Sequence, residues 1–357
     1  MGFFWARHEP AHAMSRAWLK WAQSAHGPLW VDCCRHGPLA VAIPYNTTNA
    51  LENKDWRNEM KEEFTALQLR NPWELVEPEE NMKIVGNKWV YKIKYNPDET
   101  VSRYKVRLVA KGYHQTVGVD YTETFSPIAK SATVKMMLSI TVAKGREIKQ
   151  VDVNNAFLNG ELNKEVFMEQ PKGFVYPKHL KAVCKLKKAL YGLKHTPRAW
   201  YEKLKRALIE WGFKNAISNT LLFYQNRGEN QLLVLVYVDN ILTTGSQIKN
   251  IQKVIDLLVN KFAPKELGPL GYFLGIKVKR DESGMHLTQT KYIQDLLKKT
   301  CMKYCKGSPT PISTTVKYRV NLEIKEGGRP FEDKTLHRSV IGALQYATIT
   351  RPESLSV

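Results

Sequence analysis

The strongest constraint on the fold of this 357-residue chain is one apolar segment interrupted by two polar residues. Residues 232–238 are seven consecutive apolar residues, Asp239 and Asn240 follow, and Ile241 and Leu242 resume the apolar pattern. A run of this length predicts a buried strand, and the interruption predicts a hairpin with Asp239 and Asn240 at its tip. A membrane helix needs about 20 apolar residues. We therefore expect a buried sheet and no contact with a membrane.

The composition excludes a disordered chain and a disulfide-stabilised secreted domain. Hydrophobic residues make up 43% of the chain, and the net charge of +20 is spread over its whole length. The five cysteines are odd in number and scattered, which predicts free thiols in a reducing compartment. The N-terminus lacks the basic head and apolar stretch of a secretory signal. We expect an intracellular protein, cytoplasmic if expressed, while the host compartment and the oligomeric state stay open.

The positive charge is concentrated in one segment. Between residues 178 and 214 there are eleven Lys and Arg residues and only two acidic residues. Two interpretations compete, a solvated helix face and a surface that follows a phosphate backbone. We favour the second, with Lys203, Lys205 and Arg206 as candidate contacts to nucleic-acid phosphates.

A second basic surface is predicted on a hairpin. The segment KWVYKIKY, from Lys88, alternates aromatic or aliphatic residues with lysines, and the returning segment VSRYKVRLVAKG alternates Arg103, Lys105 and Arg107 with apolar residues. Both strands thus carry a basic face. A core sheet would rarely contain so many cations on one side, so we expect a mobile hairpin that touches phosphates.

The remaining periodicity predicts helices and hairpins in alternation, which indicates an α+β fold. A helix is expected over residues 50–70 and another over 131–144 with Ser131 as its cap. A third should begin at Thr196 as cap and end before Gly212. Further helices are expected over 246–262 and from about residue 290, and a further hairpin with its turn at residues 282–284 separates them.

Two carboxylates at strand ends are candidates for chemistry. Asp152 ends the predicted strand EIKQVDV, and Asp239 lies at the tip of the apolar hairpin. Taken singly, each is typical of a turn or a helix cap. Brought together by adjacent strands, they would form a Mg²⁺ site, because Mg²⁺ prefers oxygen ligands and is held by one or two carboxylates plus substrate phosphates. Next to two basic surfaces, this pattern predicts phosphoryl transfer on nucleic acid.

A series of motifs then resembles one known family over residues 49–357. In order they are NPWELV, KWVYKIKY, RYKVRLVAKGYHQ, VDYTETFSPIAK, QVDVNNAFLNGEL, LKKALYGLKHTPRAWYEKL, LVLVYVDNILTTG, ELGPLGYFLGIKV and ITRPESLSV. They resemble the reverse transcriptase, or RNA-directed DNA polymerase, of the Pol polyprotein of copia-type LTR retrotransposons. The motifs occur in the family's order.

The resemblance implies a right-hand polymerase with a ferredoxin-like palm sheet. Residues 1–45 match nothing in the family, and we expect a poorly ordered extension there. Residues 46–130 would form a lead-in helix and the fingers, and residues 131–285 the palm with some fingers elements. Residues 286–357 would begin the thumb, and we expect the chain to be a degenerate or truncated copy.

The resemblance also implies the catalytic residues. Asp152 matches the first catalytic aspartate, and the carbonyl of Val153 a further metal contact. Asp239 matches the first aspartate of the YVDD hairpin. The implied cofactor is Mg²⁺, as two ions, with Mn²⁺ as an alternative. The implied partners are an RNA or DNA template with its primer and deoxynucleoside triphosphates.

The resemblance places the incoming nucleotide among five residues. Lys105 and Arg107 fall where the fingers contact the triphosphate, and the sequence does not decide between them. Phe157 resembles the aromatic gate that rejects a ribose 2′-hydroxyl, although a core phenylalanine is the plain alternative. Tyr191 and Gly192 resemble the template and nucleotide platform.

The hairpin that grips the primer terminus is implied at a separate place. Phe273, Leu274 and Gly275 match it. In a polymerase of this kind, the cations Lys203, Lys205 and Arg206 would contact primer and template. The reaction implied for the whole site is in-line attack of a primer 3′-hydroxyl on the α-phosphorus of a deoxynucleoside triphosphate.

Three departures from the family motifs bear on activity. Asn240 stands where the family has the second aspartate of YVDD, so that the site loses one formal negative charge. His195 and Thr196 replace the more usual Gln and Ser. We expect an impaired polymerase; the alternatives are a non-catalytic nucleic-acid-binding remnant of the same fold and a pseudogene product that is hardly made.

Overall fold

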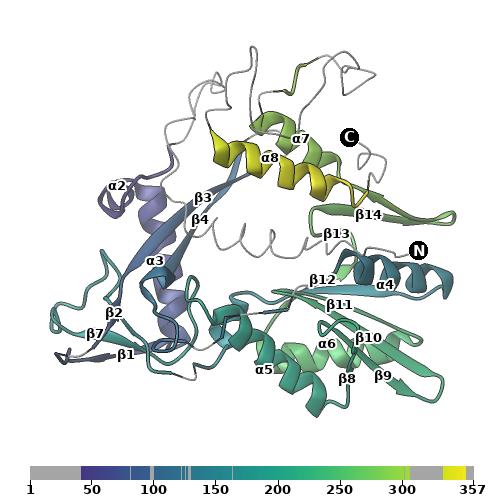
Figure 1. The fold of residues 1–357 in the computed structure, drawn as a ribbon, viewed down its shortest axis with the longest axis horizontal. Helices are drawn as coiled ribbons and strands as arrows, with labels where there is room; N and C mark the ends of the chain where they lie inside the picture. The colour runs from purple at the N-terminus through teal and green to yellow at the C-terminus, as the bar shows by residue number, and fades with distance from the viewer. Residues whose placement is uncertain are drawn as a thin grey trace, which may run out of the picture. The chain divides into compact units, whose positions relative to one another are not determined.

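The computed structural model describes residues 42–305, apart from 81, 97–99, 122, 125, 128–129, 163 and 301, and residues 333–350. The chain divides into two compact units, residues 1–268 and 269–357 (Figure 1). The predicted extension over residues 1–45 lies, except for 42–45, outside the described residues. The predicted boundaries of fingers, palm and thumb stay predictions.

The first unit contains a six-stranded sheet, called here the main sheet. Its strand order is β12 (Lys265–Pro269), β5 (Ile148–Asp152), β11 (Asn240–Gly245), β10 (Asn230–Tyr237), β9 (Leu222–Arg227) and β8 (Lys214–Asn215). The central strands β5, β11 and β10 are antiparallel neighbours. Their apolar side chains form a core, since Val234, Leu235, Ile241 and Leu242 are fully buried. The predicted buried hairpin is therefore confirmed.

The tip of this hairpin differs from the prediction by one residue. Tyr237 pairs with Asn240, so the two loop residues are Val238 and Asp239. Asn240 is thus the first paired residue of β11 and not part of the turn. The physical reason is the register with β5, which places Asn240 opposite Asp152.

Three helices accompany the main sheet: α4 (Ser131–Ala143), α5 (Thr196–Glu210) and α6 (Ile248–Phe262). Two predicted caps are wrong. Ser131 and Thr196 are the first residues of their helices, and the hydroxyl of Thr196 donates 2.7 Å to the carbonyl of Leu190. A hydroxyl that finds a buried carbonyl partner from another segment is not available to cap its own helix.

The predicted helix over residues 50–70 is two helices, α2 (Thr47–Glu52) and α3 (Lys54–Leu69). Asn53 separates them, because its backbone is extended and its side chain accepts hydrogen bonds from the N–H groups of Asp55 and Trp56. An asparagine that caps a helix in this way begins a new helix.

The predicted basic hairpin is formed by β3 (Asn87–Tyr95) and β4 (Val101–Ala110), paired over their whole length. One face packs on α3 and is part of a hydrophobic core that includes Trp56, Met60, Trp89 and Leu108. The indole of Trp56 lies edge-on to the ring of Tyr104, with 4.7 Å between the two ring centroids. The apolar face of the hairpin is therefore a core face, while its opposite face carries the cations.

A small sheet completes the first unit. Its order is β1 (Trp73–Val76), β7 (Val183–Leu186), β6 (Phe167–Met168) and β2 (Ile84–Val85), with β2 and β6 parallel. Two short 3-10 helices, η1 (Gly112–His114) and η2 (Ala156–Asn159), lie in segments that lead to the candidate site.

The second unit holds a three-stranded sheet and two helices. The strands are β13 (Tyr272–Phe273), β14 (Ile276–Asp281) and β15 (Gly284–Thr288), and the helices are α7 (Thr290–Lys299) and α8 (Lys334–Ala347). The predicted hairpin turn at residues 282–284 and the helix from residue 290 are confirmed.

Mixed helices and largely antiparallel sheets confirm the α+β class. No described helix has the length and apolarity to cross a bilayer.

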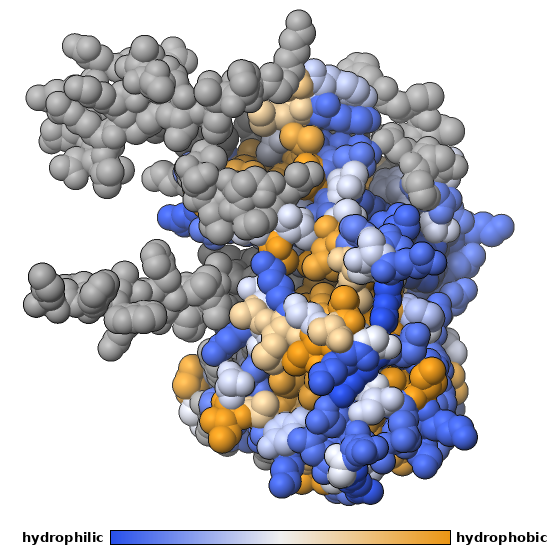
Figure 2. All heavy atoms as spheres, turned by 90° about the vertical axis from the view of Figure 1, so that its right-hand side faces the viewer, coloured by the Kyte–Doolittle hydropathy of each residue, from blue (hydrophilic) through white to orange (hydrophobic). Residues whose placement is uncertain are grey.

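Hydrophilic side chains predominate on the face drawn in Figure 2, with hydrophobic patches between them. Of the five cysteines, Cys184 and Cys305 are described, and both are free thiols.

Candidate active site

The two predicted catalytic carboxylates lie on adjacent strands of the main sheet. Asp152 ends β5 and faces Asn240, the residue that follows Asp239. The backbone N–H of Val153 donates 2.8 Å to the carbonyl of Asp239 and fixes the two strand ends to each other. The structure therefore brings Asp152, Val153 and Asp239 together, as predicted.

The hairpin tip that carries Asp239 is strained and is held from outside. Val238 has φ of 56°, a left-handed conformation that is a genuine outlier for a β-branched residue. The indole Nε1 of Trp200 donates 2.6 Å to the carbonyl of Val238. Trp200 is itself fixed against Phe262 of α6, with 5.1 Å between ring centroids. Strain that surrounding structure maintains is typical of functional sites.

The charge of Asp239 is unfavourable in this position. Burial raises the pKa of Asp239, and the negative charge of Asp152 raises it further, while Arg107 and Asn240 act in the opposite direction. Two carboxylates close enough to repel each other favour a cation between them. The pair therefore has the electrostatic character of a cation site.

The donor set fits one magnesium ion. Asp152 and Asp239 offer hard carboxylate oxygens, and Mg²⁺ is typically held by one or two carboxylates with phosphates and water completing its shell. No cluster of three or more His, Cys, Asp or Glu side chains suited to a metal occurs among the described residues. A second ion would therefore depend on oxygens that the substrate brings.

Asn240 does not present its oxygen to the two carboxylates. Its Oδ1 accepts a 2.7 Å hydrogen bond from Nε2 of Gln150, and its Nδ2 donates at 3.5 Å to Oδ1 of Asp239. Gln150 is buried, with 4% of its surface exposed. In this chain residue 240 is a hydrogen-bond donor to Asp239.

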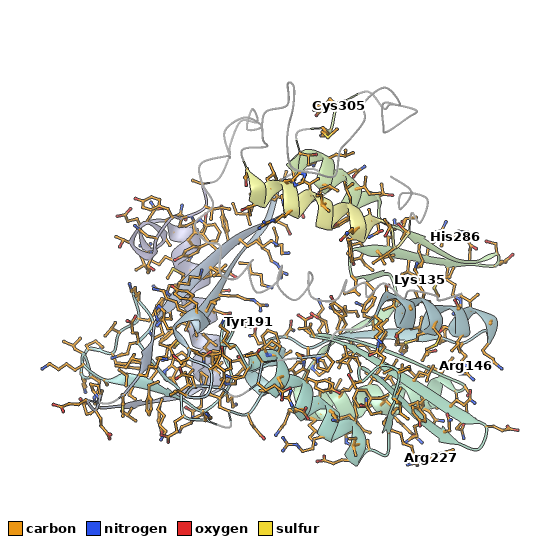
Figure 3. The ribbon with its side chains drawn as sticks, in the orientation of Figure 1. Lys135, Arg146, Tyr191, Arg227, His286 and Cys305 are labelled. Carbon is orange, nitrogen blue, oxygen red and sulfur yellow. The ribbon has the colours of Figure 1, made fainter. Side chains whose placement is uncertain are left out.

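Beside the carboxylates, Arg107, Tyr191 and Phe157 form a stack, here called the platform stack. The guanidinium of Arg107 lies 4.3 Å above the ring of Tyr191, and the ring of Phe157 meets Tyr191 edge-on at 4.8 Å. Tyr191 is labelled in Figure 3, between the β3–β4 hairpin and α5. Burial raises the pKa of Tyr191, with opposing effects of Arg107 and Asp239. Two predicted nucleotide contacts, Arg107 and Tyr191, thus interact electrostatically with Asp239, and the third, Phe157, contacts Tyr191.

Arg107, and not Lys105, is the hairpin cation whose charge acts on Asp239 and on Tyr191. Burial lowers the pKa of Lys105, as do the charges of Arg107, Lys94 and Arg103, while Glu63 acts in the opposite direction.

Gly192 is required by a close backbone approach. Its φ is 93°, and a Cβ built on it would lie 2.1 Å from the carbonyl oxygen of Ala110. Opposite it, a Cβ on Gly112 would lie 2.0 Å from the carbonyl oxygen of Gly192. The N–H of Ala110 donates 2.8 Å to the carbonyl of Tyr191. These contacts fix the platform stack to the end of β4.

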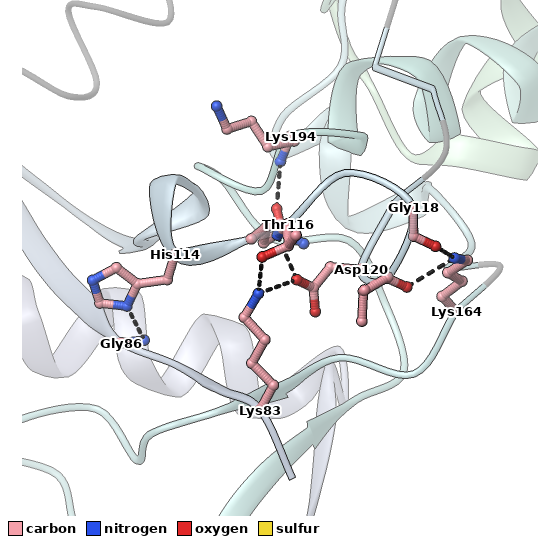
Figure 4. A network of polar contacts seen from close by, with 10 residues as sticks. Lys83, Gly86, His114, Thr116, Gly118, Asp120, Lys164 and Lys194 are labelled. Carbon is pink, nitrogen blue, oxygen red and sulfur yellow. Dashed lines mark hydrogen bonds and ion pairs between the residues drawn. The ribbon is translucent and has the colours of Figure 1, made fainter. Parts of the chain in front are cut away.

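The loop of residues 112–121 next to Gly192 is braced by lysines (Figure 4). Lys83 Nζ lies 2.7 Å from Asp120 Oδ2. Lys164 Nζ donates 2.6 Å to the carbonyl of Gly118. These lysines therefore stabilise the protein itself, which the count of cations in the sequence does not reveal.

His195, one of the three departures from the family motifs, is half-buried between this loop and α5. Both its ring nitrogens lack a hydrogen-bond partner among the described residues. Burial lowers the pKa of His195, and Asp120 opposes that effect. Burial therefore favours the neutral form of the imidazole.

Glu63 of α3 reaches the cations of β4. Burial raises the pKa of Glu63, while Arg107, Lys105 and the backbone N–H of Leu108 act in the opposite direction. Glu59, one helical turn earlier, interacts in the same way with Arg103 and Lys105. α3 thus places two carboxylates along the edge of β4.

Replacing Glu63 with glutamine should make folding stability less dependent on pH. The folded-state pKa of Glu63 lies above its ordinary value of 4.5, so the folded chain binds more protons in that window and stability falls as the pH rises through it. The melting temperature of Glu63→Gln relative to the original chain should therefore increase as the pH rises above 4.5. A difference that stays constant with pH would contradict this.

The α5 cations predicted to contact primer and template already form ion pairs with carboxylates of this chain. Lys203 and Arg206 both pair with Glu161, Arg206 at 3.4 Å. Lys205 lies 4.0 Å from Glu202 and 5.8 Å above the ring of Tyr201. Their nucleic-acid contacts stay a prediction, and an acid partner would have to be released for each.

In the second unit, Phe273 and Ile276 pair around a two-residue turn. Leu274 and Gly275 have φ of 51° and 73°, as a type I′ turn requires, although Leu is an unusual residue there. The hydroxyl of Tyr346 in α8 donates to the carbonyl of Leu274. The predicted primer-grip residues thus form a tight, supported turn.

The roles of three residues at the site were not predicted from the sequence: Gln150, Glu63 and Trp200. Gln150 was recognisable in principle, because it precedes Asp152 by two residues and so shares its face of β5. Nothing local marked the role of Glu63 or of the Trp200 indole, since their partners are distant in sequence.

Comparison with known proteins decides the family. A family model described as "Reverse transcriptase (RNA-dependent DNA polymerase)" matches residues 70–314. The chain belongs to this family. It is 43% identical over 321 residues to the "Retrovirus-related Pol polyprotein from transposon RE1" of Arabidopsis thaliana, covering 88% of this chain and 22% of that protein. The predicted copia-type resemblance is confirmed.

A relative from tobacco agrees. The chain is 36% identical over 301 residues to the "Retrovirus-related Pol polyprotein from transposon TNT 1-94" of Nicotiana tabacum, covering 82% of this chain and 22% of that protein. This reverse transcriptase chain thus spans about a fifth of the length of these relatives. A solved foamy viral protease-reverse transcriptase with double-stranded DNA gives a TM-score of 0.45 at 14% identity, over 83% of this chain and 41% of that chain.

Proposed function

We propose that this chain forms the fingers, palm and beginning of the thumb of a copia-type reverse transcriptase. Its reaction would be the template-directed addition of deoxynucleotides to a primer 3′-hydroxyl with Mg²⁺, slowed by Asn240. The observation that carries the proposal is the proximity of Asp152 and Asp239 to the platform stack of Arg107, Tyr191 and Phe157.

The cations of the β3–β4 hairpin support a polyanionic partner. Residues opposite one another in an antiparallel pair share a face, and here Lys92 pairs with Lys105 and Lys94 with Arg103. Like charges directly opposite are destabilising. A surface that keeps such pairs despite their cost is suited to a bound phosphate backbone or triphosphate.

In the proposed mechanism the protein mainly positions the substrates and neutralises the charge of their phosphates. Asp152 and Asp239 would hold a divalent cation, with the Val153 carbonyl beside them. Mg²⁺ bound there would lower the pKa of the primer hydroxyl and stabilise the charge of the leaving pyrophosphate. Arg107 would neutralise the triphosphate, and Tyr191 with Gly192 would support the nucleotide and template. Charge stabilisation and orientation supply most of the barrier reduction.

Replacing Phe157 with valine should admit ribonucleotides. Phe157 is 4% exposed and contacts Tyr191, so a smaller side chain opens space beside the platform stack. In the Asn240→Asp background the ratio of deoxy to ribo incorporation efficiency should fall at least about tenfold, which needs only about 1.4 kcal/mol.

The control for this change is Phe223→Val, which removes packing from another fully buried phenylalanine of the first unit. It should lower stability by a comparable amount and leave the ratio unchanged. An unchanged ratio for Phe157→Val would identify Phe157 as a core residue only.

The second candidate function is nucleic-acid binding without catalysis. Asn240 favours it, because its oxygen is bonded to Gln150 and not directed to the carboxylate pair. Primer extension on an RNA template with Mg²⁺ or Mn²⁺ tests the two functions against each other. Incorporation that Asp152→Ala abolishes supports the polymerase; tight binding without incorporation supports the remnant.

A further inference from the structure

Gln150 is a buried side chain that forms a direct hydrogen bond with the side chain of residue 240. In the register of β5 and β11, Asn240 faces Asp152 and Leu242 faces Gln150. Gln150 is therefore the diagonal neighbour of Asn240 on the same face, within reach of a long side chain. Its Nε2 lies 2.7 Å from Oδ1 of Asn240.

Asp239 determines which residue donates and which accepts in the hydrogen bond between Gln150 and Asn240. An ionised carboxylate only accepts hydrogen bonds, so the amino group of Asn240, 3.5 Å away, is the end that can face it. The Asn240 oxygen then points to Gln150, which must donate. Each of the two hydrogen bonds, from Gln150 to Asn240 and from Asn240 to Asp239, thus pairs one donor with one acceptor.

We propose that Gln150 is a positioning residue that sets the orientation of side chain 240 in the active site. The proposal rests on the proposed function. With asparagine at position 240, the single oxygen is held by Gln150 and is withheld from a cation between Asp152 and Asp239. With aspartate there, one oxygen accepts from Gln150 and the second faces the cation. This difference in the number of oxygens explains why the amide and the carboxylate are not equivalent at this position.

The test is Mn²⁺ affinity, measured on the full chain without nucleotide in four proteins: the original, Gln150→Met, Asn240→Asp and the double variant. Methionine keeps the length of the side chain and removes the donor. In the Asn240→Asp background, loss of Gln150 should weaken Mn²⁺ binding about tenfold or more, as loss of a residue supporting a ligand does. In the original background the change should be much smaller.

Gln170→Met is the matched control, because Gln170 is a buried glutamine of the first unit that donates to the carbonyls of His179 and Ala182. It should lower the melting temperature and leave Mn²⁺ affinity unchanged in both backgrounds. Equal losses for Gln150→Met in both backgrounds, or no loss in either, would overturn the positioning role.

A second measurement needs no metal. Gln150→Met and Asn240→Leu each break the same hydrogen bond, so the double variant should melt no lower than the less stable single variant. Additive losses would overturn the proposal. If no variant binds Mn²⁺, the proposed metal site fails, and this stability cycle alone then decides whether Gln150 holds residue 240.

Discussion

Replacing Asn240 with aspartate should raise Mg²⁺-dependent deoxynucleotide incorporation at least about tenfold, since only about 1.4 kcal/mol of transition-state stabilisation is needed for that factor. The substitution is nearly isosteric, and the new carboxylate can keep the hydrogen bond from Gln150. It would stand opposite Asp152 and next to Asp239. The measurement is the rate of primer extension with and without Mg²⁺.

The melting temperature of Asn240→Asp should depend on Mg²⁺ even without primer, template or nucleotide. A third carboxylate beside a pair that already repels should lower the melting temperature in chelator, and Mg²⁺ should restore it by binding the folded form. Asn240→Asp with Asp152→Ala should be inactive, which excludes a contaminating polymerase. A variant with neither incorporation nor a Mg²⁺-dependent rise in melting temperature would favour the binding-only function.

Neutralising the cationic face of the β3–β4 hairpin should weaken binding to a primer-template duplex by a factor on the order of 10² at about 0.1 M salt. The change is Lys92, Arg103 and Lys105 to glutamine. Each lost phosphate contact on B-form DNA should reduce the slope of log affinity against log salt by about 0.9, so the slope should flatten by about 2 to 3. The measurement is a salt titration of affinity.

The α5 cations provide a control with the same change in charge. Changing Lys203, Lys205 and Arg206 to glutamine should weaken binding less, because each of these three side chains already forms an ion pair with a carboxylate at 4.0 Å or less. A larger loss of affinity for the α5 variant would place the main phosphate contacts on α5.

The elements with a clear period were predictable from the sequence. The seven-residue apolar run predicted the buried hairpin of β10 and β11, and the alternation of lysines predicted the cationic face of β3 and β4. Periodicity works here because a strand exposes alternate residues to opposite faces whatever its partner is. The motifs around Asp152 and Asp239 likewise pointed to the family that comparison confirmed.

The ends of elements were less predictable, because they depend on partners from elsewhere in the chain. Thr196 has the side chain of a helix cap, yet its hydroxyl donates to Leu190. Residues 50–70 have one continuous helical period, yet Asn53 accepts two backbone hydrogen bonds and begins a second helix.

The residue types available for chemistry could be identified from the amino-acid sequence: two strand-end carboxylates, an asparagine in place of a third, and two cationic surfaces. How these residues are arranged depends on the folded chain. Folding directs the oxygen of Asn240 to Gln150, places Arg107 over Tyr191 and gives Lys203 and Arg206 an acidic partner in Glu161. The physical reason is that a side chain's orientation and charge are set by neighbours in space, and these neighbours are up to 90 residues away in sequence.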